Sequence, residues 1–314
     1  MSDAVLLLAH GTPDRVEEIP EYLSCVTGGR PLPKEVVEEV SHRFAVIGGS
    51  PLTALTLEQG RLLEQEIGVP VYVGMRNWRP YIADVVKKMR EDGVTRAVVI
   101  CLAPQNSRTS VGLYRKAVFA AAQDALQLHF VEDWADAPLL ADAFAERLVA
   151  TRDAFSTEVG ASAPVLFTAH SVPCRTVLSA PGTDGNATAP PDPYPVEAKQ
   201  TARLVASRIP GLREQDWFFA FQSQGMSGGP WIGPTVEDTL TALHQQGVTN
   251  LIIQPIGFLC DHVEILYDID VGFKEFGTKL GMTVRRPGSL NGSRLLTLAL
   301  ADLARDGLAA SHSS

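Results

Sequence analysis

The chain alternates between short apolar runs and longer segments in which apolar residues recur every three or four positions. The short runs, such as Val165–Ala169 and the run VLLLA before His10, have the length and composition of strands buried on both faces of a parallel sheet. Longer segments such as Leu55–Ile67, which ends at Gly68, have the pattern of amphipathic helices. This alternation predicts an α/β fold with parallel sheets flanked by helices.

The same pattern places the individual elements. Besides the strand that leads to His10, strands are predicted over Val71–Gly74, Ala97–Leu102, Leu128–Val131, Val165–Ala169, Trp217–Phe221, Leu251–Ile256 and Thr283–Arg285. Helices are predicted over Thr12–Leu23, Lys34–Phe44, Leu55–Ile67, Ile82–Arg90, Ser110–Ala125, Leu139–Phe155, Val196–Ile209, Thr235–Gln246, His262–Phe276 and Arg294–Asp306. Loops rich in glycine and proline are predicted over Pro181–Pro195 and Gly225–Pro234.

The second half of the chain resembles the first. The first strand runs into AHGTP and the strand Val165–Ala169 runs into AHSVP, half a chain apart, which indicates two strand–helix units in equivalent positions. We therefore predict an N-terminal domain over residues 1–145 and a C-terminal domain over residues 146–290. A helix over residues 293–308 is a candidate to complete the first domain.

Histidines stand where two of these strands end, and open α/β sheets bind ligands at the carboxyl ends of their strands. His170 follows the strand Val165–Ala169, and His10 ends the first strand. The His170 imidazole can act as a base near neutral pH. The alternative is that each histidine only orders its own turn through hydrogen bonds.

A third strand end carries acidic residues. In LIIQPIGFLCDHVEILYDID, residues 251–270, the strand breaks at a proline and a glycine into a helix with Asp261, His262 and Glu264 in its first turns. Glu264 can take or pass a proton, and with an imidazole it can hold a divalent cation. Asp268 lies four residues beyond Glu264, so both carboxylates are expected on one helix face. A solvated acidic stripe is the alternative.

A tryptophan follows the strand Trp217–Phe221. Gln222 and Ser223 close that strand, and Trp231 lies in the glycine-rich loop after it. Its ring can stack on a flat ligand, or it can cover the core.

Composition narrows the class of protein. The 314 residues are 45% hydrophobic and 20% charged, as is usual for a soluble enzyme, and the net charge of −9 argues against a nucleic-acid partner. Four dispersed cysteines without CxxC spacing argue against a disulfide framework, a zinc ribbon or an iron–sulfur cluster, and favour the cytoplasm. We expect no signal peptide and no membrane span. The G-x-G-x-x-G, G-x-x-x-x-G-K-[ST] and G-x-S-x-G motifs are absent, which argues against nucleotide cofactors and hydrolases of that type.

Three segments together resemble the signature segments of the ferrochelatase family, whose members insert ferrous iron into a porphyrin. They are FTAHSVP at 167–173, FQSQGMSGGPWIGP at 221–234 and PIGFLCDHVEILYDID at 255–270. GTP at 11–13, IGGSPL at 47–52 and APQNSRTSVGLY at 103–114 are similar to further family segments. The resemblance implies two similar Rossmann-like, chelatase-type domains with the porphyrin cleft between them. It also implies that iron is a substrate, that no cofactor is required, and that neighbouring haem-pathway enzymes are candidate partners.

The resemblance assigns roles to particular residues. It makes His170 the cleft histidine and Glu264 its acidic partner, which share pyrrole deprotonation and metal handling. His10 stands where many short bacterial members carry a tyrosine that faces the metal, so it is a candidate ligand. Asp268 resembles the outer step of an acidic path, and the next step falls on Gly272, which shortens that path. The expected porphyrin-binding residues are His10, Arg30, Arg43, Ser50, Tyr114, Ser223 and Trp231.

The identity of the porphyrin substrate is less constrained by the sequence than the family is. In the family that the chain resembles, membrane-associated enzymes that use protoporphyrin carry a longer, apolar lip in the segment that corresponds to Thr12–Gly48. This segment is short and lacks an apolar insertion here, so the resemblance favours coproporphyrin III, with its four propionates, over protoporphyrin IX. Two alternatives are a sirohydrochlorin or cobalt chelatase with His10 as its main ligand, and a non-catalytic haem or porphyrin carrier. The Glu264 segment argues against the first alternative, and the presence of both His170 and Glu264 argues against the second.

Overall fold

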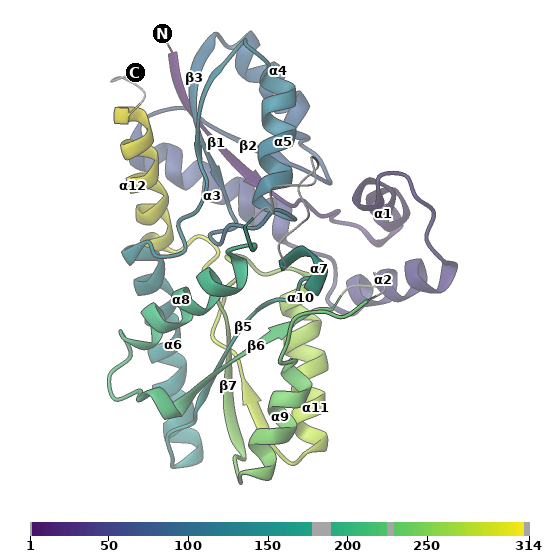
Figure 1. The fold of residues 1–314 in the computed structure, drawn as a ribbon, viewed down its shortest axis with the longest axis vertical. Helices are drawn as coiled ribbons and strands as arrows, with labels where there is room; N and C mark the ends of the chain where they lie inside the picture. The colour runs from purple at the N-terminus through teal and green to yellow at the C-terminus, as the bar shows by residue number, and fades with distance from the viewer. Residues whose placement is uncertain (1, 178–189, 225–228, 311–314) are drawn as a thin grey trace.

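Two parallel four-stranded sheets form the framework of the protein (Figure 1). The structure is a computed structural model that describes residues 2–177, 190–224 and 229–310. The strand order is β2-β1-β3-β4 in the first sheet and β6-β5-β7-β8 in the second, so β1 and β5 occupy equivalent positions. The α/β architecture and the repeat are confirmed. The strands are β1 Ser2–Ala9, β2 Val71–Met75, β3 Val94–Cys101, β4 Gln127–Val131, β5 Val165–His170, β6 Trp217–Gln222, β7 Asn250–Pro255 and β8 Thr283–Arg285.

Helices cover both faces of each sheet. On the first sheet, α4 and α5 pack on one face, while α3, α6 and α12 pack on the other. The helices are α1 Ile19–Thr27, α2 Lys34–Val46, α3 Leu52–Ile67, α4 Ile82–Glu91, α5 Val111–Ala122, α6 Pro138–Val159, α7 Cys174–Val177, α8 Tyr194–Ala206, α9 Val236–Gln245, α10 Val263–Leu266, α11 Lys274–Lys279 and α12 Arg294–Ala310.

The central strands are apolar because both of their faces are buried. In β1, Leu6 and Leu8 contact the α4–α5 layer, whereas Leu7 contacts the opposite layer, and all three are completely buried. The core around Leu7 continues through α6 into the second sheet, where it includes Phe167 of β5. The two halves therefore share one continuous apolar core. The domain ranges 1–145 and 146–290 stay a prediction, and α6 crosses the boundary between them.

Two predicted helices differ from the structure. The helix predicted over Thr12–Leu23 begins later, with a short 3-10 turn at Val16–Glu18 followed by α1, whose second residue is Pro20. Proline is well tolerated in the first turn of a helix, so this position is compatible with a start at Ile19. The predicted loops Pro181–Pro195 and Gly225–Pro234 lie partly outside the described residues.

The helix predicted over His262–Phe276 is broken into α10, a π-helix over Asp268–Phe273 and α11. The backbone N–H groups of Val271 and Gly272 both donate to the Tyr267 carbonyl, so one turn contains an extra residue. This turn allows Asp268 and Asp270 to reach different polar partners. The regular helical period of the sequence gives no sign of that break.

None of the helices in the described part of the chain is both long enough and apolar enough to cross a membrane. Helices α1 and α2 project from the first half as an arm (Figure 1).

A buried arginine fixes the segment between β7 and α11. Arg286, which follows β8, is only 9% exposed and donates from Nη2 to Asp270 at 2.6 Å. The same nitrogen lies 3.4 Å from Asp261, at the other end of the segment. Burial raises the pKa of Asp270, but the bonds from Arg286 and Lys274 outweigh it and lower that pKa. Arg286 therefore connects both ends of the segment that carries Glu264.

Removing this arginine should destabilise the protein strongly. Arg286→Met removes the cation that Asp261 and Asp270 share, while Asp270 keeps Lys274, and we expect a loss of about 2 kcal/mol or more in the free energy of unfolding. The matched control is Arg285→Met, which removes a neighbouring arginine whose partner Glu158 is 53% exposed. That variant should lose at most about 1 kcal/mol. Urea unfolding followed by circular dichroism measures both, and equal losses would contradict the assignment.

Candidate functional site

A cavity of about 400 Å³ lies between the two halves, next to the carboxyl ends of β1 and β5. Its volume is in the range of small-molecule sites, and its position follows the rule for open parallel sheets. Five of the residues predicted from the sequence line it together: His10, Tyr114, His170, Trp231 and Glu264. Segments far apart in the chain thus meet around one space.

The remaining predicted residues lie outside this lining, within the part of the chain that the structure describes. Arg30 is exposed and donates to the Thr27 carbonyl at 3.1 Å. Ser50 is buried and accepts a hydrogen bond from the Thr12 hydroxyl at 2.8 Å. The three others, Arg43, Ser223 and Asp268, form a separate polar cluster next to the site.

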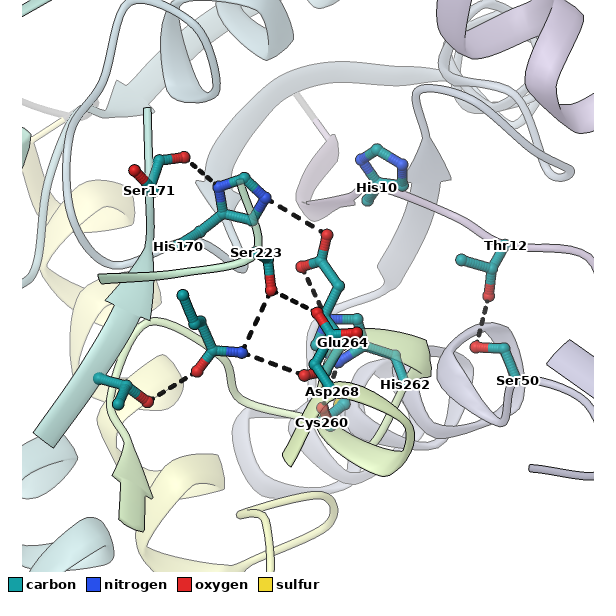
Figure 2. Close-up of polar contacts among 12 residues, drawn as sticks. His10, Thr12, Ser50, His170, Ser171, Ser223, Cys260, His262, Glu264 and Asp268 are labelled. Carbon is teal, nitrogen blue, oxygen red and sulfur yellow. Dashed lines mark hydrogen bonds and ion pairs between the residues drawn. The ribbon is translucent and has the colours of Figure 1, made fainter. Parts of the chain in front are cut away.

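His170 is the last residue of β5, and both of its ring nitrogens have partners (Figure 2). Nδ1–H donates to the Ser171 carbonyl, and Nε2 lies 3.3 Å from Glu264 Oε1. Burial lowers the pKa of His170, but the negative charge of Glu264 and its hydrogen bond outweigh that effect and raise it. Because Nδ1 is held by a backbone carbonyl, Nε2 is the nitrogen that gains and loses the proton.

Glu264, in the first turn of α10, lies between two imidazoles. Its second oxygen is 3.4 Å from Nε2 of His262, whose Nδ1–H donates to the Cys260 carbonyl at 3.0 Å (Figure 2). Burial alone would raise the pKa of Glu264, but both histidines stabilise the carboxylate and hold its pKa well below the usual range. The Gln222 side chain donates to the Glu264 carbonyl at 3.0 Å and so ties this turn to β6.

His10 approaches the cavity from the first half, and its pKa is shifted in the opposite direction to that of His170. Burial, with the nearby positive charge of Arg76, lowers the pKa of His10 to about 4. Its Nε2 lies 2.8 Å from the Tyr22 hydroxyl, and the Asn77 amide nitrogen lies 3.2 Å from each ring nitrogen. At neutral pH this imidazole is therefore uncharged and retains one nitrogen lone pair.

Asp268 links the two halves just outside the cavity. It accepts a hydrogen bond from Ser223 at 2.6 Å, and its other oxygen lies 3.4 Å from Arg43 of α2. Burial raises the pKa of Asp268, and the Ser223 and Arg43 contacts oppose that effect. The Arg43 guanidinium also lies 5.2 Å from the Tyr267 ring centroid.

Trp231 lies at the cavity wall next to His170, with their ring centroids 6.5 Å apart. The backbone holds it there, because Ile232 N–H donates to the Val172 carbonyl at 3.0 Å. The ring is thus positioned beside the catalytic candidate, where it can contact a flat ligand.

Several lining residues were not selected from the sequence. They are Tyr22, Arg76 and His262, together with Asn77 behind His10. The strand-end rule could have identified Arg76 and Asn77, because they directly follow β2, which pairs with β1. Tyr22 had no such signal, since it comes from the arm.

Among the described residues, no group of three or more His, Cys, Asp and Glu side chains converges to hold a metal ion. His170 and Glu264 meet directly as a pair, and His10 lies opposite them (Figure 2). A metal ion in this cavity would therefore need ligands from more than one of these places.

Comparisons with known proteins agree on one family. The family model described as Ferrochelatase matches residues 2–308. A ferrochelatase of Acidobacterium capsulatum is 69% identical over 309 residues, which cover 97% of this chain and 94% of that protein. A coproporphyrin III ferrochelatase of a Geobacillus species is 32% identical over 308 residues, covering 95% of each chain.

Solved structures show the same fold. SirB from Bacillus subtilis with Fe3+ superposes with a TM-score of 0.56 at 14% identity, covering 100% of this chain and 98% of that one. At this identity the likeness concerns the fold, which is the two-domain chelatase type predicted from the sequence.

The opposite pKa shifts of the two histidines can be measured directly. As the pH falls, His170 should bind a proton before His10, because Glu264 stabilises the charged form of His170 while burial and Arg76 destabilise that of His10. Heteronuclear NMR of the imidazole rings follows the protonation of both histidines. In its neutral form, His170 should carry its proton on Nδ1. Glu264→Gln should lower the pKa of His170, whereas Glu275→Gln, at an exposed position of α11, should leave it unchanged. Protonation of His10 first would refute the assignment.

Proposed function

The chain belongs to the ferrochelatase family and inserts ferrous iron into a porphyrin in haem synthesis, and we propose that its porphyrin is coproporphyrin III. It is a metal chelatase of the lyase class, so the alternatives of a sirohydrochlorin or cobalt chelatase and of a non-catalytic carrier are set aside. We also propose that the reaction requires no bound cofactor and takes place in the cytoplasm. Neighbouring enzymes of the haem pathway remain candidate partners.

The preference for coproporphyrin III is supported by the arm and by a relative. The arm α1–α2 has charged residues along α2, including Lys34 and Glu38, which form an exposed ion pair. Such a polar arm suits a substrate with four propionates. One relative that matches nearly the whole chain is named a coproporphyrin III ferrochelatase, and this chain shares 32% of its residues.

The observation that carries the proposed mechanism is the contact between His170 and Glu264 at the cavity wall. Insertion of Fe2+ releases the two pyrrole N–H protons of the macrocycle, so the site must accept protons while the metal enters. With neutral His170 and ionised Glu264, His170 Nε2 carries a lone pair that can take a pyrrole proton, and the adjacent Glu264 then stabilises the imidazolium. The charge of Glu264 raises the pKa of His170 and makes it a stronger base.

Glu264 has a second partner that allows the proton to leave. Once His170 is an imidazolium, Glu264 lies between it and His262, so the carboxylate can pass the proton from one Nε2 to the other. That returns His170 to its basic form for the second pyrrole proton. The ferrous ion replaces the two protons in the ring, so charge and atoms balance. His170 and Glu264 titrate as a coupled pair, because each changes the pKa of the other.

The propionate contacts stay proposals of unequal support. Tyr114 is best placed, since it lines the cavity and lies under the Arg76 guanidinium at 5.4 Å. Arg43 would have to exchange its bonds to Glu39 and Asp268 for a propionate. Arg30 has its contact with Thr27 away from the lining, and Ser50 lies behind the lining residue Thr12. To act as part of a metal path, Asp268 would have to release Arg43.

His170→Ala should abolish iron insertion while coproporphyrin III still binds, because the change removes the proton acceptor and little apolar contact. The expected loss of turnover is at least roughly 100-fold. The turnover of Glu264→Gln should also fall steeply, since the amide has the shape of the carboxylate but is not basic. His244→Ala, an exposed histidine of α9, is the control and should retain wild-type turnover. Turnover of a His170→Ala variant above about a tenth of wild type would contradict general-base catalysis by this residue.

His10 is proposed as a nitrogen ligand of the iron. Its low pKa keeps it neutral, and neutral imidazole binds iron well. In the structure both ring nitrogens contact protein groups, so the metal would displace Tyr22 or Asn77 from one of them. The alternative is that these contacts are its whole role.

The bound product distinguishes the two roles of His10. His10→Ala should change the visible absorption bands of the iron–porphyrin product complex and weaken retention of that product. His10→Tyr should give a tyrosinate-like spectrum of the ferric product. Identical spectra for the wild type and His10→Ala would exclude the ligand role and leave His10 as a structural residue.

A further inference from the structure

Behind the cavity, a buried carboxylate joins the two halves. Asp192 is 3% exposed and, within the described residues, is not part of the cavity lining. Its Oδ2 accepts hydrogen bonds from the Arg108 backbone N–H at 2.8 Å and the Ser107 hydroxyl at 3.3 Å. Its Oδ1 accepts from the Tyr194 N–H at 3.1 Å. One side chain thus binds the segment before α5 in the first half and the start of α8 in the second.

Both ends of this bridge lead directly to the cavity. Ser107 lines it, as does Ser110 a few residues on. On the other side, Tyr194 lines the cavity and its hydroxyl donates to the His170 carbonyl at 2.8 Å. Asp192 is therefore connected to the wall contributed by the first half and, through Tyr194, to the strand end that carries His170.

Further contacts extend the bridge along α8, which lies where the two halves meet (Figure 1). The Asn106 N–H donates to Glu197 at 2.6 Å, and the Gln105 amide donates to the Thr201 hydroxyl at 3.1 Å. Glu197 and Thr201 are four residues apart, so one face of α8 follows the segment 105–108. We call this set of contacts the α8 seam.

A carboxylate is required at position 192 because every partner is a donor. A carboxylate only accepts hydrogen bonds, and it can satisfy donors at both oxygens. An asparagine would turn its NH2 group toward one of these donors and leave it unpaired in a buried place. The rest of the seam would then have to hold the two walls alone.

We propose that Asp192 is a positioning residue for iron insertion: it holds the His170 wall and the Ser107–Ser110 wall at the spacing that fits the porphyrin plane. This inference rests on the proposed function of the cavity. If the seam is weakened, part of the binding energy of the porphyrin is needed to realign the walls. The groups that face the metal, Glu264 and His10, are not contacted by Asp192 and keep their partners.

The test compares the KM values of the two substrates in Asp192→Asn. The KM for coproporphyrin III should rise about tenfold, which corresponds to about 1.4 kcal/mol and is within the cost of one unpaired buried donor. The KM for ferrous iron should not change. Destabilisation alone would reduce the amount of active enzyme and therefore kcat, with both KM values unchanged. An unchanged porphyrin KM would overturn the proposal.

Two further variants keep the test decisive. Glu197→Met leaves the Asn106 N–H unpaired and should raise the porphyrin KM in the same direction, even if Asp192→Asn does not fold. Asp142→Asn breaks the ion pair between α6 and Arg208 of the segment after α8, outside the seam, and should leave both KM values unchanged. An equal rise of the porphyrin KM in this control would refute the proposal.

Porphyrin binding without iron separates this proposal from the proposed function. Fluorescence quenching gives the dissociation constants of coproporphyrin III for the wild type and the seam variants, and these do not depend on catalysis. If Asp192→Asn binds coproporphyrin III more weakly than the wild type does, that result by itself supports the positioning role. It does so even if the wild type inserts iron into another porphyrin. Equal dissociation constants contradict that role even if the wild type is active.

Discussion

The carboxylate of Glu264 lies between Nε2 of His170 and Nε2 of His262, and the proposed mechanism depends on this contact. Each imidazole uses its Nδ1–H to bind a backbone carbonyl, so both present the nitrogen that can lose a proton to the same carboxylate. A buried carboxylate would ordinarily be destabilised, but here the two histidines compensate for its desolvation. In the proposed mechanism, this arrangement lets His170 accept pyrrole protons and pass them through Glu264 toward His262.

The rest of the fold serves to hold that contact opposite His10. Strands β1 and β5 have equivalent places in two similar sheets, so the residues at their ends approach one space from opposite sides. Arg286 fixes the segment that carries Glu264, and the α8 seam joins the walls behind it. Burial and the charge of Arg76 lower the pKa of His10, whereas Glu264 raises the pKa of His170, which suits the ligand and base roles proposed for these two side chains.

The sequence predicted what depends on local pattern. Apolar runs and their polar ends located both sheets and placed His10, His170 and Glu264 at one site. It could not predict contacts made by tertiary structure, such as that of Asp192 with Arg108, which are 84 residues apart. The π-helix was missed for the same reason, because Asp270 meets Arg286 only in the folded chain. Long, flexible arginines were the least predictable site residues: Arg30 and Arg43 bind other protein groups in the structure.

Ferrous iron insertion by the wild-type protein, measured in parallel with coproporphyrin III, protoporphyrin IX and sirohydrochlorin, tests the account most directly. The two porphyrins share the flat macrocycle that the cavity between the halves should hold, and they differ in their number of propionates. We predict rapid insertion into coproporphyrin III, slower insertion into protoporphyrin IX and none into sirohydrochlorin. Faster insertion into sirohydrochlorin than into either porphyrin, or no insertion into any of the three, would contradict the account.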